Sequence, residues 1–295
     1  MTQAILDQHG AAFADFPAQA APAPTRSDAA YLAALAACSQ LGFIAHDAEC
    51  VAQAWQQQTR RTGAFSAAQW PVEPADFGLQ PRPHGQSFAA CPKDLGLYAV
   101  LPDAAWVGRM ARAGVPTVQL RFKSDDPEAI AAEVRASVEA VKGTGANLYI
   151  NDHWRIAIDA GSYGVHLGQE DLDALHADEI RTLRDSGVRL GVSTHGYAEM
   201  VRADAVSPSY IAMGAVYPTT LKKMATVPQG VARLERYAQL MRDYPQVAIG
   251  GIGFAQFPEI LATGVGSIAV VRALVNAENP EATAAELMAA MKASV

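Results

Sequence analysis

Short polar clusters follow a series of apolar, strand-like runs in this 295-residue chain. They contain amides, carboxylates, hydroxyls, cations and a glycine pair, at Gln119, Arg121 and Lys123; Asn151 and Asp152; Asp171; Ser193 and His195; Thr219, Lys222 and Lys223; and Gly250 with Gly251. Strands that are buried on both faces should carry almost no charge. Polar groups that recur where strands end therefore predict one shared site, which is assembled from several loops and faces a charged ligand.

The first cluster has the composition of an anion clamp. Gln119, Arg121 and Lys123 alternate with apolar residues, so they should share one face of a strand. A half-solvated strand of an antiparallel sheet would show the same pattern. In a parallel barrel both faces are covered, and two inward cations are costly to desolvate unless an anion meets them. Arg121 offers a planar fork for phosphate oxygens and Lys123 a compact charge, which favours anion binding.

Two carboxylates, Asp152 and Asp171, each follow a strand-like run and should project into the same mouth. Together with the nearby cations they predict a Mg²⁺ site that bridges to substrate phosphates, because Mg²⁺ often takes few protein carboxylates. Taken alone, Asp171 is better explained as a helix N-cap, since it precedes a helical pattern. The pair, together with Asn151, favours the metal.

Hydroxyl groups and histidines occur near the same ends, but their spacing does not predict a nucleophile and its base. Ser193 and His195 lack a nucleophile elbow, so Ser193 is expected to hydrogen-bond a ligand and His195 to act as a cap or to support the site from behind. His166 is expected to be a hydrogen-bonded core histidine rather than a base.

A long loop runs from Tyr217 to about Gly230, and loops of that length are often functional lids. Its lysines, Lys222 and Lys223, suit phosphate oxygens, although a solvated lysine pair would look the same. Gly250 and Gly251 would permit close approach of backbone N–H groups to a second anion. Two phosphate-bearing ligands, or one bisphosphate, are therefore expected.

The elements that must position these residues alternate regularly after residue 92. Eight strand-like runs occur at LGLYAVL, TVQLRF, NLYIND, GVHLGQ, RLGVST, SYIAMGAV, QVAIGGI and SIAVVRAL. Helical patterns separate them, for example over 127–142, 173–185, 231–242 and 280–292. This alternation predicts parallel pairing, and eight units in about 200 residues fit a (β/α)8 TIM barrel over residues 93–295. A doubly wound sheet is the alternative, but no G-x-G-x-x-G fingerprint is present.

Residues 1–92 differ in composition and form an N-terminal extension of unknown function. Residues 1–28 are rich in Ala and Pro and predict a disordered tail, whereas residues 31–61 show helical periodicity. Gly42 should break that pattern, and Asp47 could cap the second helix. Five prolines between residues 71 and 92 predict a linker.

Composition narrows the class of protein. The net charge of −7 argues against a nucleic-acid binder, and no apolar run reaches the roughly 18 residues that span a membrane. The three cysteines lack metal or redox spacing, and the first residues do not read as a secretory signal. We expect a cytoplasmic protein with small-molecule substrates, and a homo-oligomer remains possible.

The motifs QLRFK, YIND, GVHLGQED, GVSTH, MGAVYPTTLKK and AIGGI, in this order, resemble the thiamine-phosphate synthase family over about residues 95–291. The resemblance implies a transferase that joins hydroxymethylpyrimidine diphosphate to hydroxyethylthiazole phosphate, releasing pyrophosphate by a dissociative mechanism. It implies Mg²⁺ on Asp152 and Asp171, and catalytic cations Arg121, Lys123 and Lys222. The implied pyrimidine diphosphate contacts are Gln119, Leu120, Arg121, Phe122, Lys123, Asn151, Ser193 and Lys222. The implied thiazole phosphate contacts are Thr219, Thr220, Leu221, Gly251, Val271 and Arg272.

Two positions depart from the family pattern. Leu221 stands where the family usually has threonine, and Arg272 where it usually has serine. Our hypothesis is that Arg272 or Thr220 replaces the lost hydroxyl contact to the thiazole phosphate. A thiazole tautomerase-like barrel and a non-catalytic sensor of thiamine precursors, with the extension as its partner-binding module, are the alternatives.

Overall fold

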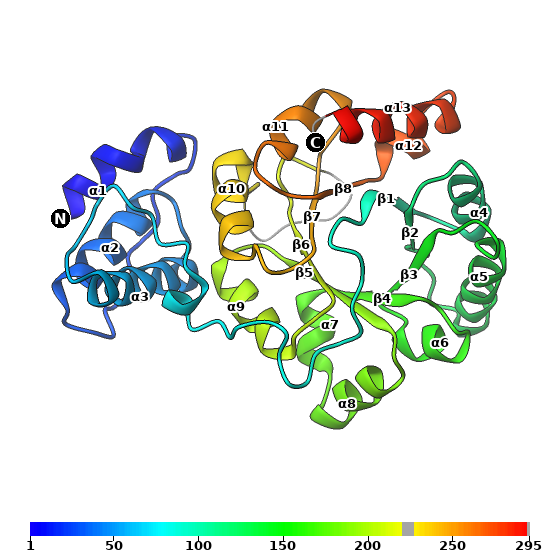
Figure 1. Cartoon of the computed structure of the whole chain (residues 1–295), viewed down its shortest axis with the longest axis horizontal. Helices are drawn as coiled ribbons and strands as arrows, with labels where there is room; N and C mark the ends of the chain where they lie inside the picture. The colour runs from blue at the N-terminus through cyan, green and yellow to red at the C-terminus, as the bar shows by residue number, and fades with distance from the viewer. Residues whose placement is uncertain (220–226, 294–295) are drawn as a thin grey trace.

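A computed structural model describes residues 1–219 and 227–293, and it contains a closed barrel of parallel strands with a helical extension beside it (Figure 1). Neighbouring strands follow one another in chain order, and the eighth pairs with the first. The strands are β1 (Gly96–Leu101), β2 (Thr117–Leu120), β3 (Asn147–Asn151), β4 (Gly164–Leu167), β5 (Arg189–Thr194), β6 (Tyr210–Met213), β7 (Gln246–Ile249) and β8 (Ser267–Val270). The predicted (β/α)8 barrel is confirmed, and each predicted run contains one strand.

Helices follow every strand and cover the outside of the barrel (Figure 1). They are α4 (Ala104–Arg112), α5 (Pro127–Ala140), α6 (Trp154–Asp159), α7 (Gln169–Ala174), α8 (Ala177–Asp185), α9 (Tyr197–Val206), α10 (Gly230–Leu240), η3 (Phe254–Gln256), α11 (Phe257–Leu261), α12 (Arg272–Val275) and α13 (Pro280–Ala293). The single helix expected over 173–185 is wrong. It is two helices, because the Glu179 side chain accepts a hydrogen bond from the backbone N–H of His176 and so starts α8 there.

The strands bury their side chains in two layers, since successive residues point to opposite faces. Leu97, Ala99 and Leu101 of β1 pack in the layer that also contains Val107 and Met110 of α4. The alternate residues lie inside the barrel, in a cluster that includes three tyrosines, Tyr98, Tyr149 and Tyr210. Their rings meet edge to face with centroids 5.1–6.0 Å apart. Large aromatic rings therefore fill the barrel interior.

The extension consists of α1 (Thr2–His9), η1 (Gly10–Phe13), α2 (Ala29–Gln40), α3 (Ala45–Thr62) and η2 (Pro74–Phe77). The disordered tail predicted for residues 1–28 is wrong at its start. Ile5 and Phe13 are 0% and 2% exposed and belong to the same hydrophobic cluster as α2 and α3. The segment is ordered despite a composition typical of disorder, because Ile5 and Phe13 bury their side chains against α2 and α3.

Gly42 separates α2 from α3 with a φ of +81°, as the sequence predicts. The capping role expected for Asp47 is wrong, because α3 begins at Ala45 and places Asp47 inside its first turn. The carboxylate accepts instead from the backbone N–H of Ala198 in α9, at 2.9 Å. Asp47 thus connects the extension to the barrel, although the sequence predicted that it would cap its own helix.

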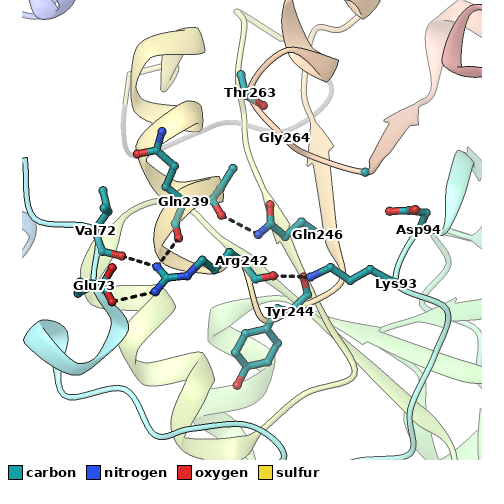
Figure 2. Close-up of a pocket in the computed structure, with 12 residues that line it drawn as sticks. Val72, Glu73, Lys93, Asp94, Gln239, Arg242, Tyr244, Gln246, Thr263 and Gly264 are labelled. Carbon is teal, nitrogen blue, oxygen red and sulfur yellow. Dashed lines mark hydrogen bonds and ion pairs between the residues drawn. The ribbon is translucent and has the colours of Figure 1, made fainter. Parts of the chain in front are cut away.

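A seam joins the linker before β1 to the amino end of the barrel and encloses a cavity of about 450 Å³ (Figure 2). Arg242 donates to the carbonyl of Val72 and to the Glu73 carboxylate, each at 2.9 Å. Lys93 donates to the carbonyls of Arg242 and Tyr244, at 2.5 and 2.6 Å. The amino end of such barrels serves stability, and these bonds fix the linker there.

Among residues 1–219 and 227–293, none of the helices has both the length and the apolar composition that a membrane span requires.

Candidate functional site

A cavity of about 620 Å³ lies at the carboxyl ends of the strands. Ten of the residues that the sequence predicts for substrates or metal line it: Gln119, Arg121, Asn151, Asp152, Asp171, Ser193, Thr219, Gly251, Val271 and Arg272. Because the barrel is closed, the ends of β2 to β5 face those of β7 and β8 across one mouth. The residues of the two anion sites expected from the sequence therefore line opposite sides of a single cavity.

Three predicted contacts do not line the cavity with their side chains. Leu120 is 1% exposed in the layer between strands and helices, and Phe122 packs partly buried against that layer. Lys123 is exposed beyond the end of β2, which stops at Leu120. The shared strand face predicted for the first cluster is thus real for Gln119, whereas Arg121 and Lys123 follow the strand. Thr220, Leu221, Lys222 and Lys223 lie outside the described residues.

A chain of hydrogen bonds crosses the floor of the cavity and joins five strands. Gln119 Nε2 donates to the Tyr98 hydroxyl at 2.9 Å, and the Tyr98 and Tyr210 hydroxyls lie 2.7 Å apart. The Tyr210 hydroxyl is 2.7 Å from His166 Nδ1, and His166 Nε2 is 2.8 Å from Ser193 Oγ. Burial raises the pKa of Tyr98 and of Tyr210, so both phenols keep their protons.

One order of donors gives every hydrogen in this chain a partner. In it Gln119 donates to Tyr98, Tyr98 to Tyr210, and Tyr210 to His166 Nδ1. In this arrangement His166 carries a proton on Nε2 and donates to Ser193 Oγ. The Ser193 hydroxyl hydrogen is left to donate into the cavity. The prediction that His166 is a hydrogen-bonded core histidine is confirmed, and that it is not a base stays a prediction.

Asp152 and Asp171 both line the cavity, and the N-cap role considered for Asp171 is wrong, because α7 begins at Gln169 and places Asp171 in its first turn. Its Oδ2 accepts from the Gly168 backbone N–H at 3.0 Å, which satisfies the N-cap donor at the start of α7. Its second oxygen remains for a ligand. No group of three or more acidic, histidine or cysteine side chains gathers around a possible metal position within the described residues. Two carboxylates fit Mg²⁺ that takes its other ligands from substrate and water.

Glycine is required on the opposite side of the cavity. Gly250 and Gly251 have φ values of +102° and +69°, a region that side chains rarely adopt. A Cβ at Gly251 would lie 2.7 Å from the Pro218 carbonyl oxygen. Arg272 begins α12 directly after β8, and it lines the cavity together with Val271. Close-packed backbone and one guanidinium therefore face the space in which a second anion is expected.

Two helix starts fix the backbone around Ser193. Gln169 Nε2 donates to the Ser193 carbonyl at 2.6 Å, and Gln169 is in turn held by Arg202. Glu199 accepts from the backbone N–H and from Nδ1 of His195, at 2.8 and 2.7 Å. Burial raises the pKa of Glu199, but the hydrogen bonds and charge of His195 outweigh it, so the pKa lies below its ordinary value.

The sequence interpretation missed Tyr98, Tyr210 and Gln169. The tyrosines are inward residues of continuous apolar runs, where an aromatic ring is ordinarily core. The available signal was a hydroxyl group at an inward position of a parallel strand, because a buried hydroxyl needs a partner. Gln169 stands inside the GQED motif, and nothing local indicates that it reaches β5.

Comparisons with known proteins show the family of this chain. A sequence model of the family described as thiamine monophosphate synthase matches residues 97–274. A thiamine-phosphate synthase of Neisseria meningitidis serogroup B is 49% identical over 196 residues, covering 66% of this chain and 94% of that protein. One of Salmonella paratyphi B is 47% identical over 202 residues, covering 68% and 94%.

Among solved structures, a thiamine phosphate pyrophosphorylase from Pyrococcus furiosus has a TM-score of 0.60 and 24% identity. The match covers 68% of this chain and 97% of that one, and it bears on the fold. The family resemblance noted in the sequence is confirmed by the family match and by the identities of nearly half. The chain therefore belongs to the thiamine monophosphate synthase family, and it is an enzyme, a transferase of thiamine biosynthesis.

Proposed function

We propose that this chain joins hydroxymethylpyrimidine diphosphate to hydroxyethylthiazole phosphate, giving thiamine phosphate and pyrophosphate. The observation that supports it best is the single cavity in which residues for a diphosphate, a metal and a second phosphate line opposite sides. One mouth can hold two reactants together, which supplies much of the rate enhancement in a reaction without an acid–base pair.

The diphosphate side contains Arg121 and Asn151 with the two carboxylates. Asp152 and Asp171 would hold Mg²⁺, which when bound supplies positive charge to the departing pyrophosphate. Arg121 binds the same oxygens by charge-assisted hydrogen bonds, and Lys123 and Lys222 are proposed to join it when substrate is present. These cations stabilise the negative charge that develops as the carbon–oxygen bond breaks.

The pyrimidine ring is proposed to rest on the polar floor of the cavity. Gln119 and Ser193 are the two ends of the hydrogen-bond chain, and each has a side chain on the cavity wall. When His166 Nε2 donates to Ser193 Oγ, the Ser193 hydroxyl hydrogen is available to the substrate. The thiazole phosphate is proposed to lie against Gly250, Gly251 and Arg272.

The proposed mechanism is dissociative. The pyrimidine methylene loses pyrophosphate to give a cation that the aminopyrimidine stabilises, and the thiazole nitrogen then attacks it. This chain's residues bind, orient and neutralise charge, and no covalent intermediate with the protein is needed. The engagement of both His166 nitrogens supports this choice, since the imidazole serves as a link in the floor rather than as a base.

The two alternatives are separated by one experiment. Purified protein is supplied with both substrates, with Mg²⁺ or with excess chelator, and thiamine phosphate is quantified by thiochrome fluorescence after oxidation. We expect product only with both substrates and Mg²⁺. A thiazole tautomerase would isomerise the thiazole without releasing pyrophosphate, and a sensor would bind precursors without product; either result would contradict the proposal. The cytoplasmic location and a homo-oligomer stay predictions.

A further inference from the structure

One buried carboxylate of the extension contacts the barrel directly behind the cavity. Asp47 is 6% exposed, and its Oδ1 accepts from the Ala198 backbone N–H at 2.9 Å. Gly196, the N-cap residue of α9, lies so close that a Cβ there would be 2.1 Å from Asp47 Oδ2. Asp47 thus occupies the place of an N-cap side chain that the glycine cannot supply, although it comes from 151 residues away.

Aromatic residues of the extension hold the same end of α9. Trp70 donates from Nε1 to the Tyr197 hydroxyl at 2.9 Å, and the Phe77 ring stacks on Tyr197 with centroids 5.3 Å apart. Tyr197 is the first residue of α9 and is fully buried. The beginning of this helix is therefore packed against the extension.

The extension also contacts α10. The guanidinium of Arg233 lies 3.6 Å from the centre of the Phe16 ring and 4.3 Å from that of Phe43. At the other end, Arg242, just beyond α10, binds Val72 and Glu73 of the linker (Figure 2). Contacts at both ends of α10 keep the extension in one position relative to the barrel.

The chain between this contact and the cavity is very short. β5 ends at Thr194 and α9 begins at Tyr197, so only His195 and Gly196 separate them. Ser193 and His195 line the cavity. The first turn of α9 is thus two residues away from the end of the strand that carries Ser193.

We propose that Asp47 is a positioning residue for the active site: it caps α9 from the extension and so fixes the β5–α9 loop, which holds the end of β5 where Ser193 meets the pyrimidine substrate. This inference rests on the proposed function for the role of Ser193. Burial raises the pKa of Asp47, so an ionised carboxylate at this place costs folding free energy. A role in fixing the loop explains why it is there.

The relative from Neisseria meningitidis serogroup B has no room in its sequence for an extension of this length. The alignment with the Neisseria protein leaves 6% of that protein uncovered, since 94% is aligned, which is too little for a segment of this size. The contact is thus an addition to the barrel of the family.

The test compares four full-length proteins: wild type, Asp47→Ala, Asp47→Asn and Asp76→Ala. Asp76 is the matched control, because it is also buried in the extension, at 5% exposure, but pairs with Arg61 at 2.6 Å and not with the barrel. Asparagine keeps an oxygen for the Ala198 N–H. For Asp47→Ala we expect the KM for the pyrimidine diphosphate to rise about five-fold, the size of one N-cap contact, with the KM for the thiazole phosphate unchanged.

Asp47→Asn should bring the KM for the pyrimidine diphosphate most of the way back to the wild-type value. Asp76→Ala should lower Tm and leave that KM unchanged. Hydrogen exchange of a peptide over residues 191–200 provides a second measurement, which needs no substrate: exchange at the start of α9 should be faster in Asp47→Ala alone. An unchanged KM and unchanged exchange in a folded Asp47→Ala protein would overturn the inference. If wild type forms no product, the proposed function fails, whereas the exchange comparison still decides whether Asp47 holds the loop.

Discussion

Removing one hydroxyl from the cavity floor, in Tyr210→Phe, tests the hydrogen-bond chain directly. The Tyr210 hydroxyl contacts both Tyr98 and His166 at 2.7 Å, and all three side chains are buried. The substitution leaves the Tyr98 proton and His166 Nδ1 without their partner. Each unsatisfied buried group costs about 1–3 kcal/mol, so the free energy of unfolding should fall by about 2–6 kcal/mol.

The chain offers a matched control in Tyr149→Phe. The Tyr149 hydroxyl is also buried, but it makes no hydrogen bond of normal geometry to the described residues, and its polar neighbour is the weakly polar thiol of Cys91. Removing this hydroxyl should be neutral or stabilising. In thermal unfolding followed by circular dichroism, Tyr210→Phe should lower Tm by at least about 4 °C, whereas Tyr149→Phe should not lower it.

The same pair of variants tests the link from the floor to the substrate. Without Tyr210, His166 is no longer fixed in the tautomer that donates to Ser193, so one substrate hydrogen bond loses its direction. We expect the KM for the pyrimidine diphosphate to rise about three- to ten-fold, the worth of one net hydrogen bond, with little change for the thiazole phosphate. Equal Tm and KM values for Tyr210→Phe and Tyr149→Phe would refute the reasoning.

Four further predictions concern the cavity walls and the thiols. Asp152→Asn, a change that tolerates the φ of +66° at this exposed position, should lower kcat on the order of 100-fold or more at saturating Mg²⁺ with Tm unchanged; near-normal turnover would contradict the metal assignment. Arg272→Ser should raise the KM for the thiazole phosphate about five- to ten-fold and leave that for the diphosphate alone, and an unchanged KM would show that Arg272 does not replace the family's serine. The lowered pKa of Glu199 means that its ionised form stabilises the fold fully above its ordinary pKa of 4.5 and that this gain is lost as pH falls through the folded-state value. Glu199→Gln should therefore lower Tm at pH 7 and lose that difference at acid pH, and a pH-independent difference would argue against the charge. Burial raises the pKa of Cys50 to about 12 and of Cys91 to about 11, so both thiols should react slowly with Ellman's reagent until the protein unfolds; rapid reaction of native protein would show that they are accessible.

Local patterns in the sequence determined the strands and most of the cavity wall. Apolar runs of four to six residues formed strands such as β1 and β6, because burial on both faces leaves a continuous apolar signature. Polar residues directly after such runs, Asp152 and Arg272 among them, lie in the cavity, because parallel strands of a barrel bring all their carboxyl ends to one mouth.

Contacts between distant residues were decided only by the tertiary structure. Tyr98 and Tyr210 are 112 residues apart, and neither carries a local sign that its hydroxyl will meet the other inside the barrel. Ile5 became ordered, against a composition typical of disorder, because a surface elsewhere in the chain covers it. Asp47 has the residue type and place of a cap for its own helix, and it caps α9 instead. Periodicity and strand-end polarity are properties of neighbouring residues, whereas a buried hydrogen bond depends on which surfaces folding brings together.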